Sequence, residues 1–226
     1  MEHSVTSKSA HARAKLLEAA RQALVEDGIG GASARTIAKR AGVAPGLIYY
    51  HFGDLDQLLA ATSRVFSAER AEVWQSELSS CTTLTEVVET ASRLHVTERE
   101  TGSLIMLAQL LAGGRGNETL TAAVHDNFEM LAGIVEETIS GILTGTPLDT
   151  MLDAHGLSRT ISAGFIGLEL LDNTVPDGTD LFEHLRTLAQ LADEVLGAGF
   201  ITSTWLRRRL GAPRTSSRTR STANAR

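Results

Sequence analysis

The side chains best suited to chemistry lie close together in one short segment of the chain. Tyr49 and Tyr50 are followed directly by His51, and the basic residues Arg35 and Lys39 precede them. A tyrosine offers a hydroxyl group to phosphate and a ring face to a sugar or a thymine methyl group, and a basic side chain pairs with phosphate. The segment is therefore suited to contacting DNA.

The rest of the chain offers little for catalysis. Cys81 is the single cysteine, which excludes an internal disulfide and a cysteine-rich zinc site. Residues 28–31 are rich in glycine but lack the Lys-Ser/Thr ending of a phosphate-binding loop, and no Gly-x-Ser-x-Gly motif occurs. Four histidines are dispersed, and no two of them stand one helical turn apart to bind a metal: His95, His125, His155 and His184. We expect neither an enzyme nor a bound metal or cofactor.

Two short helices must position the tyrosines. Ser33 can cap the first helix, which ends at Gly42 because glycine accepts the left-handed conformation found at helix C-termini. The second starts near Pro45, since proline is tolerated in a first turn, and runs to about His51. Two helices joined by a tight turn predict a helix–turn–helix, whose second helix enters the major groove.

Apolar residues of this pair should fix the angle between the two helices. We expect five of them to pack inward: Ala38, Ala41, Val43, Ile48 and Phe52. Four other residues are then left facing outward: Gly46, Leu47, Tyr49 and Tyr50.

The whole chain is predicted to be helical, because apolar residues recur at three- and four-residue spacing without β-branched alternation. A helix is expected from about residue 9 to residue 26, and Asp54 with Gln57 can cap another over residues 54–80. Further helices are expected over residues 83–98, 102–113, 117–144, 150–173 and 179–210. No apolar run reaches the roughly 18 residues that span a membrane. The N-terminus also lacks the basic-then-apolar order of a signal peptide, so the expected compartment is the cytoplasm.

Charge varies along the chain. The 226 residues carry 21 Lys+Arg and 27 Asp+Glu, and the net charge of −6 by itself argues against a nucleic-acid partner. Residues 28–53, however, contain three basic residues and no acid, whereas residues 61–206 contain seven basic and 21 acidic ones. This division predicts that one face approaches DNA while the acidic body is held away.

The residues from Thr36 to Phe52 read TIAKRAGVAPGLIYYHF, and they closely resemble the DNA-binding signature of the TetR family of bacterial transcriptional regulators. Residues 28–33 are similar to that family's link between its first two helices, and the resemblance covers about residues 10–60. It implies an all-α fold, in which an N-terminal three-helix DNA-binding domain precedes a larger helical domain for ligand binding and dimerisation.

The resemblance, with the basic rim, also indicates the DNA-contacting residues. These are Arg35, Thr36, Lys39, Pro45, Gly46, Leu47, Tyr49, Tyr50 and His51. Alternatives stay open: either tyrosine could be a packing residue, Lys39 and Arg40 could form a solvated face, and His51 could only interact with the helix dipole. The family usually has a lysine where this chain has Leu55, between two aspartates, so phosphate contact there falls to backbone amides.

The C-terminal body carries no motif. The family implies a small-molecule pocket among its helices, and the candidate lining residues are Trp74, His95, Met106, Gln109, His125, Phe128 and Phe165. Each could instead be an ordinary core residue. The acidic excess of the body fits either a cationic ligand or a solvated surface.

Apolar stripes on the last two predicted helices, with small residues that allow close approach, favour a four-helix contact with a second copy. The expected dimer residues are Leu157, Ile161, Gly164, Phe165, Leu168, Leu185, Leu188, Ala192 and Val195. An ordinary intramolecular core is the alternative.

We therefore divide the chain into a flexible N-terminus (residues 1–8), a helix–turn–helix domain (9–53), a ligand-binding and dimerisation domain (54–206) and an Arg-rich, disordered tail (207–226). The expected function is that of a ligand-responsive, homodimeric repressor that binds a palindromic operator in double-stranded DNA and joins the nucleoid when bound. The alternatives are a transcriptional activator and a helical interaction protein that no longer uses its helix–turn–helix on DNA. The tail either solubilises the protein or adds sequence-independent attraction to phosphate.

Overall fold

The computed structural model describes residues 2–146, 148–149, 151–171 and 181–197, and every regular element in these ranges is an α-helix. This confirms the predicted all-α fold. The Arg-rich tail, the break around Pro176 and the end of the last predicted helix lie outside the described residues. Within the described ranges, none of the helices combines the length and the apolar character needed to cross a bilayer.

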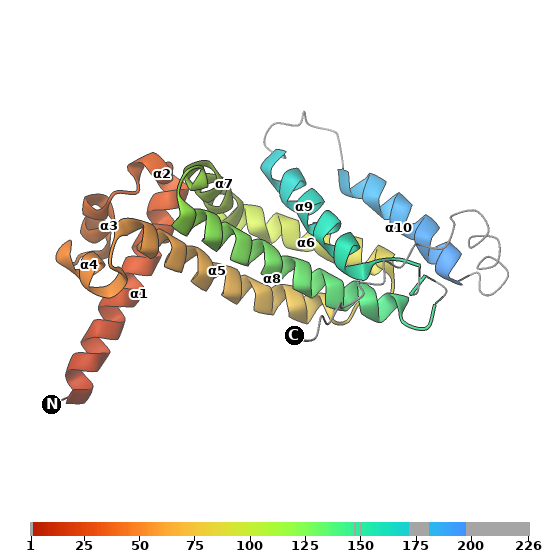
Figure 1. Ribbon diagram of the computed structural model, residues 1–226, viewed down its shortest axis with the longest axis horizontal. Coiled ribbons are helices and arrows are strands. Elements are labelled where there is room, and N and C mark those ends of the chain that lie inside the picture. The colour runs from red at the N-terminus through yellow and green to blue at the C-terminus, as the bar shows by residue number, and fades with distance from the viewer. Residues whose placement is uncertain (1, 147, 150, 172–180, 198–226) are drawn as a thin grey trace, which may run out of the picture.

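Four helices form one end of the molecule (Figure 1): α1 (Glu2–Glu26), α2 (Gly28–Gly31), α3 (Ala34–Ala41) and α4 (Gly46–Phe52). Helix α1 begins at Glu2 rather than near residue 9, so it takes in the residues that we expected to be flexible. Gly28 begins α2 just after this helix with a φ of 69°, a conformation that glycine adopts readily.

Six helices form the body: α5 (Leu55–Leu78), α6 (Leu84–Thr101), α7 (Ser103–Gly114), α8 (Glu118–Leu143), α9 (Ala154–Leu171) and α10 (Leu181–Gly197). Helix α9 starts at Ala154, four residues later than predicted. Helices α5 and α8 pack together along the long axis, α9 covers α8, and α10 packs on α6 (Figure 1). Helix α7 contacts both α8 and α1.

The largest hydrophobic core crosses the expected boundary at residue 53. It joins Leu24 of α1 and Ile48 of α4 to Leu58 of α5, and it continues to Met106 and Leu110 of α7. The N-terminal helices and the body therefore share one packed interior. Because such interiors are close-packed, a shift of α5 or α7 must be felt in the N-terminal helices.

Hydrogen bonds at the start of α6 connect this helix to α10. Thr83 and Glu86 form a capping box, and hydrogen bonds from Thr82 lower the pKa of Glu86. Asp193 of α10 accepts hydrogen bonds from the backbone N–H groups of Leu84 and Thr85, both at 2.9 Å. A carboxylate at a helix N-terminus is stabilised by the unpaired N–H groups and by the helix dipole.

Candidate functional site

Helices α3 and α4 form the predicted helix–turn–helix. The Ser33 hydroxyl oxygen accepts a hydrogen bond from the Thr36 backbone N–H at 3.1 Å, which caps α3 as expected. Gly42 ends α3 with a φ of 66°, and the Val43 N–H then donates to the Ala38 carbonyl at 3.0 Å. The turn therefore follows from a serine, a glycine and backbone hydrogen bonds that all lie within ten residues of one another.

The two helices are fixed by the core beneath them. Ile37, Ala38 and Ile48 are buried, and Ala41, Val43 and Phe52 pack partly against the same cluster, which confirms the predicted inward face. Leu47 was expected to face outward, but it is half-buried and packs on that cluster. Its apolar side chain gains more from the core than from solvent, so Leu47 has only part of its surface left for a DNA contact.

The two tyrosines of α4 are the exposed large hydrophobic side chains of α1 to α4 among the described residues. Tyr49 is 58% exposed and Tyr50 is 77% exposed, although both are adjacent to or near the fully buried Ile48. Neither is a core residue, so the alternative packing role is wrong. Arg35, Lys39, Pro45 and Gly46 are exposed as well, so most of the predicted DNA-contacting set reaches the surface.

Two members of the predicted set have other contacts. The Thr36 side chain lies 2.8 Å from the Ser33 hydroxyl, so its oxygen takes part in the cap. The half-buried His51 ring stacks edge-on between Tyr50 and Phe52, with centroids 5.0 and 6.2 Å away. His51 therefore orients the tyrosine end of the helix and is less accessible than Tyr50.

Two residues near the helix–turn–helix, Leu55 and Arg40, are engaged in contacts within the protein. Leu55 packs partly against the core at the first turn of α5, and Asp54 caps that helix by accepting from the Gln57 N–H at 2.7 Å. Arg40 pairs with Glu26 and Asp27 at the end of α1, and its hydrogen bond to Glu26 is the main cause of its raised pKa. Arg40 therefore ties α3 to α1.

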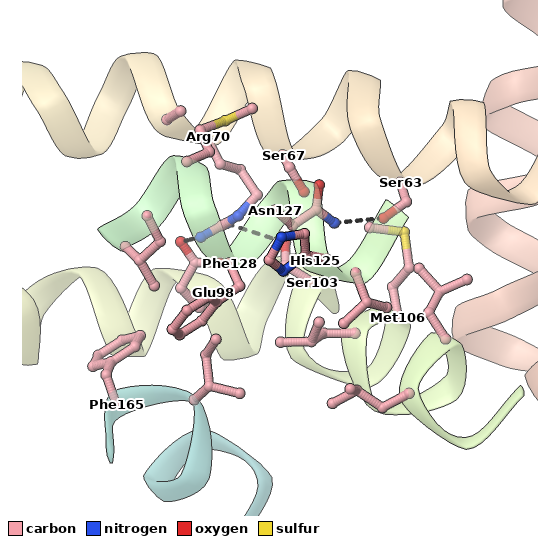
Figure 2. Close-up of a pocket in the computed structure, with 18 of the residues that line it drawn as sticks. Ser63, Ser67, Arg70, Glu98, Ser103, Met106, His125, Asn127, Phe128 and Phe165 are labelled. Atoms are coloured by element: carbon pink, nitrogen blue, oxygen red, sulfur yellow. Dashed lines mark hydrogen bonds and ion pairs between the residues drawn. The ribbon is translucent and has the colours of Figure 1, made fainter. Parts of the chain in front are cut away.

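A cavity of about 480 Å³ opens within the body, between α5, α6, α7, α8 and α9 (Figure 2). This volume is within the range of small-molecule sites. Five of the predicted lining residues border it: Trp74, Met106, His125, Phe128 and Phe165. Its walls are mostly apolar, and Phe165 stacks edge-on against Trp74 with ring centroids 5.0 Å apart.

Two predicted lining residues lie elsewhere. His95 is buried beside the ring of Phe182, with centroids 5.2 Å apart, because α6 turns that face toward α10. Gln109 faces the N-terminal helices, and its side-chain oxygen accepts a hydrogen bond from the Ile29 backbone N–H at 2.9 Å. Neither side chain is among the residues that line this cavity.

Sequence reasoning missed the polar end of the cavity. Arg70 of α5 forms an ion pair with Glu98 of α6 and donates to the Ser103 hydroxyl oxygen at 3.2 Å. Trp74 Nε1 donates to Glu98 Oε1 at 3.0 Å, and Asn127 Nδ2 donates to the Ser63 hydroxyl oxygen at 2.6 Å. These residues come from four helices, α5 to α8, and no local motif marks them.

The predicted dimer residues divide into two groups. Ile161, Gly164, Leu185, Leu188 and Val195 are exposed, and Leu191 adds to them. Leu157 packs against the core of α8, Phe165 turns toward Trp74, and Ala192 is half-buried, so these three fit an intramolecular role better. The side chain of Leu168 lies outside the described residues.

The exposed recognition helix and the cavity together define a helix–turn–helix protein with a cavity-bearing helical body. Residues 16–62 match the family model of the bacterial regulatory proteins of the tetR family. Similar proteins include the HTH-type transcriptional repressor AcnR of Corynebacterium glutamicum, 38% identical over 66 residues, and the HTH-type transcriptional regulator BetI of Paraburkholderia phytofirmans, 38% identical over 52 residues. This segment is therefore similar to the DNA-binding segment of the TetR family of regulators.

These sequence matches are local, and the fold match is global. The AcnR match covers 29% of this chain and 35% of AcnR, and the BetI match covers 23% and 27%, so the chain aligns with about a third of these relatives. A candidate transcriptional regulator from Saccharomonospora viridis, solved in complex with choline, is 21% identical and has a TM-score of 0.64. That match covers 82% of this chain and 96% of the other, so the body shares the fold as well.

Proposed function

We propose that this chain is a homodimeric transcriptional repressor that binds a palindromic operator and responds to a small molecule in the cavity. The observation that carries the proposal is the exposure of Tyr49 and Tyr50 on a helix anchored by buried Ile48. A helix anchored in this way presents one constant face, as reading a major groove requires. The similarity to the repressor AcnR supports repression, and activation is the alternative.

The exposed apolar residues of α9 and α10 support a dimer. Leu188 and Leu191 are 63% and 56% exposed, and Leu185, Val195 and Ile161 lie at 37–40%. The four residues of α10 recur at three- to four-residue spacing, and an exposed apolar stripe of this kind marks an interaction surface. A second copy across a two-fold axis would bury it and would place two recognition helices about one DNA turn apart.

Helix α7 is the proposed route from the cavity to DNA. Met106 and Leu110 of this helix belong to the core that reaches α1 and α4, and both border the cavity. Gln109 lies between them in the sequence, and its side-chain oxygen accepts a hydrogen bond from the Ile29 backbone N–H. A ligand would change operator affinity only if it prefers one arrangement of α7 over another.

We place the protein in the cytoplasm, bound to the nucleoid through its operator. The direct test is to select duplexes that bind the purified chain from a random pool and to titrate salt on the enriched sequence. We expect a palindrome and a steep loss of affinity with salt, because contacts to phosphate release counterions. A pool without enrichment, and binding that is absent at low salt, would favour the interaction-protein alternative.

A further inference from the structure

The carboxylate of Glu98 is buried, and only one of its two oxygens has a hydrogen-bond partner among the described residues. The residue is 3% exposed, and its Oε1 interacts with Trp74 Nε1 and with the Arg70 guanidinium. Its Oε2 is buried and has no hydrogen-bond partner among the described residues. Figure 2 shows Glu98 beside Arg70 at the edge of the cavity.

Asn127 supplies a second buried acceptor atom that lacks a hydrogen-bond partner among the described residues. Its Nδ2 donates to the Ser63 hydroxyl oxygen, while Oδ1 is buried and unpartnered among the described residues. Asn127 also lines the cavity. A buried acceptor without a partner is costly, so few occur in folded proteins and each requires an explanation.

The remaining walls indicate the rest of the ligand. Met106, Leu110, Leu131 and Phe128 contribute apolar surface to the same cavity. Arg70 is already engaged by Glu98 and by the Ser103 hydroxyl, so its charge is largely neutralised locally. A ligand carboxylate would therefore meet unpaired acceptors, which repel it.

We infer that the cavity takes an amphipathic ligand with an apolar body and a non-anionic polar head that donates hydrogen bonds. The head would donate to Glu98 Oε2 and to Asn127 Oδ1. This inference rests on the cavity being the effector site of the proposed function, and it adds the chemical class of the effector. A head that only accepts hydrogen bonds would leave both acceptors unpaired.

Trp74 provides a direct readout. The chain has two tryptophans, so Trp205→Phe leaves Trp74 as the one source of tryptophan emission, from within the cavity wall. This background would be titrated with three probes of equal chain length: octanamide, N,N-dimethyloctanamide and octanoate. We expect octanamide to bind at least about fivefold more tightly than either of the others. Its head is the one among the three that donates hydrogen bonds, and it carries no negative charge.

Substitutions of Glu98 and Asn127 test whether these two acceptors cause the preference for octanamide. Glu98→Gln replaces an acceptor by an N–H donor and should reduce the preference for octanamide to less than about twofold or reverse it. Glu100→Gln, on the same helix but exposed, is the matched control and should keep the preference. If Glu98→Gln does not fold by circular dichroism, Asn127→Leu removes the second acceptor and should lower the preference as well.

Equal affinities, tightest binding of octanoate, no binding of any probe, or an unchanged preference in the folded Glu98→Gln variant would overturn the inference. Operator binding would be measured separately on the same protein. Intact operator binding without the octanamide preference rejects the ligand class alone, whereas lost operator binding rejects the proposed function.

Discussion

The backbone N–H of Ile29 donates a 2.9 Å hydrogen bond to the side-chain oxygen of Gln109, 80 residues away in the sequence. Gly113 lies one turn further along α7, and a Cβ there would come within 2.5 Å of Ile29 Cδ1. Helix α7 therefore approaches the N-terminal helices closely at two points. Its other face borders the cavity, so one rigid helix contacts both regions.

Replacing Gln109 by leucine tests this connection. Gln109→Leu removes the acceptor and leaves the Ile29 N–H partly buried without a partner, which should lower the free energy of unfolding by about 1–3 kcal/mol. Urea unfolding measures the change. Gln22→Leu is the control, because the Gln22 amide donates to Glu18 within a single helix and should contribute less than about 0.5 kcal/mol. Equal losses in the two variants would contradict the assigned role of Gln109.

Tyr49 should contribute to DNA binding without contributing to stability. Its side chain is exposed, so Tyr49→Ala is expected to weaken operator binding by about 1–3 kcal/mol. The free energy of unfolding should change by less than about 0.5 kcal/mol. Fluorescence anisotropy with a labelled operator measures the affinity, and Tyr49→Phe separates the hydroxyl from the ring. An unchanged affinity in a folded Tyr49→Ala protein would show that this tyrosine does not contact DNA.

Lys39 and Arg40 are adjacent but should behave differently. Lys39 is exposed, so Lys39→Ala should weaken binding to all sequences and reduce the salt slope by about 1. Arg40 is engaged by Glu26 and Asp27, so Arg40→Ala should leave the slope nearly unchanged. Operator affinity measured over a range of salt concentrations gives both slopes. A larger slope change for Arg40→Ala would mean that its ion pairs open on DNA.

Leu188 tests the dimer surface. A glutamate at this position would be buried against the second copy, so Leu188→Glu should weaken dimerisation by about 2 kcal/mol or more. Operator affinity should fall with it. Val73→Glu on α5 is the matched control, because Val73 is 51% exposed and lies away from α9 and α10 in sequence. Sedimentation velocity reports the dimer fraction, and a stable Leu188→Glu dimer would place the interface elsewhere.

The helix–turn–helix could be predicted from the sequence because its determinants are local. The Ser33 cap, the Gly42 turn and the inward-facing Ile48 are all encoded within one short segment. Leu47 was placed wrongly, since periodicity assigns a face to a helix but does not say how far the neighbouring core extends. The start of α1 was also missed, because residues 2–8 carry no apolar pattern of their own.

The cavity could be predicted only in outline. Aromatic and sulfur-containing residues such as Trp74 and Met106 are common in apolar pockets, and they do line this one. Trp74 and Glu98 are 24 positions apart in the sequence and lie on two different helices, α5 and α6. No rule of residue spacing predicts the contact between them. His95 was misplaced for the same reason, because its environment is decided by the packing of α6 on α10.

The most direct test of the central claim is a footprint of the purified chain on the DNA beside its own gene. We expect a protected palindrome whose two halves are about one helical turn apart, and we expect the protection to be lost as salt is raised. Tyr49→Ala should need a higher protein concentration for the same protection. No protected site at low salt, with a folded protein, would contradict the claim that this helix–turn–helix reads DNA.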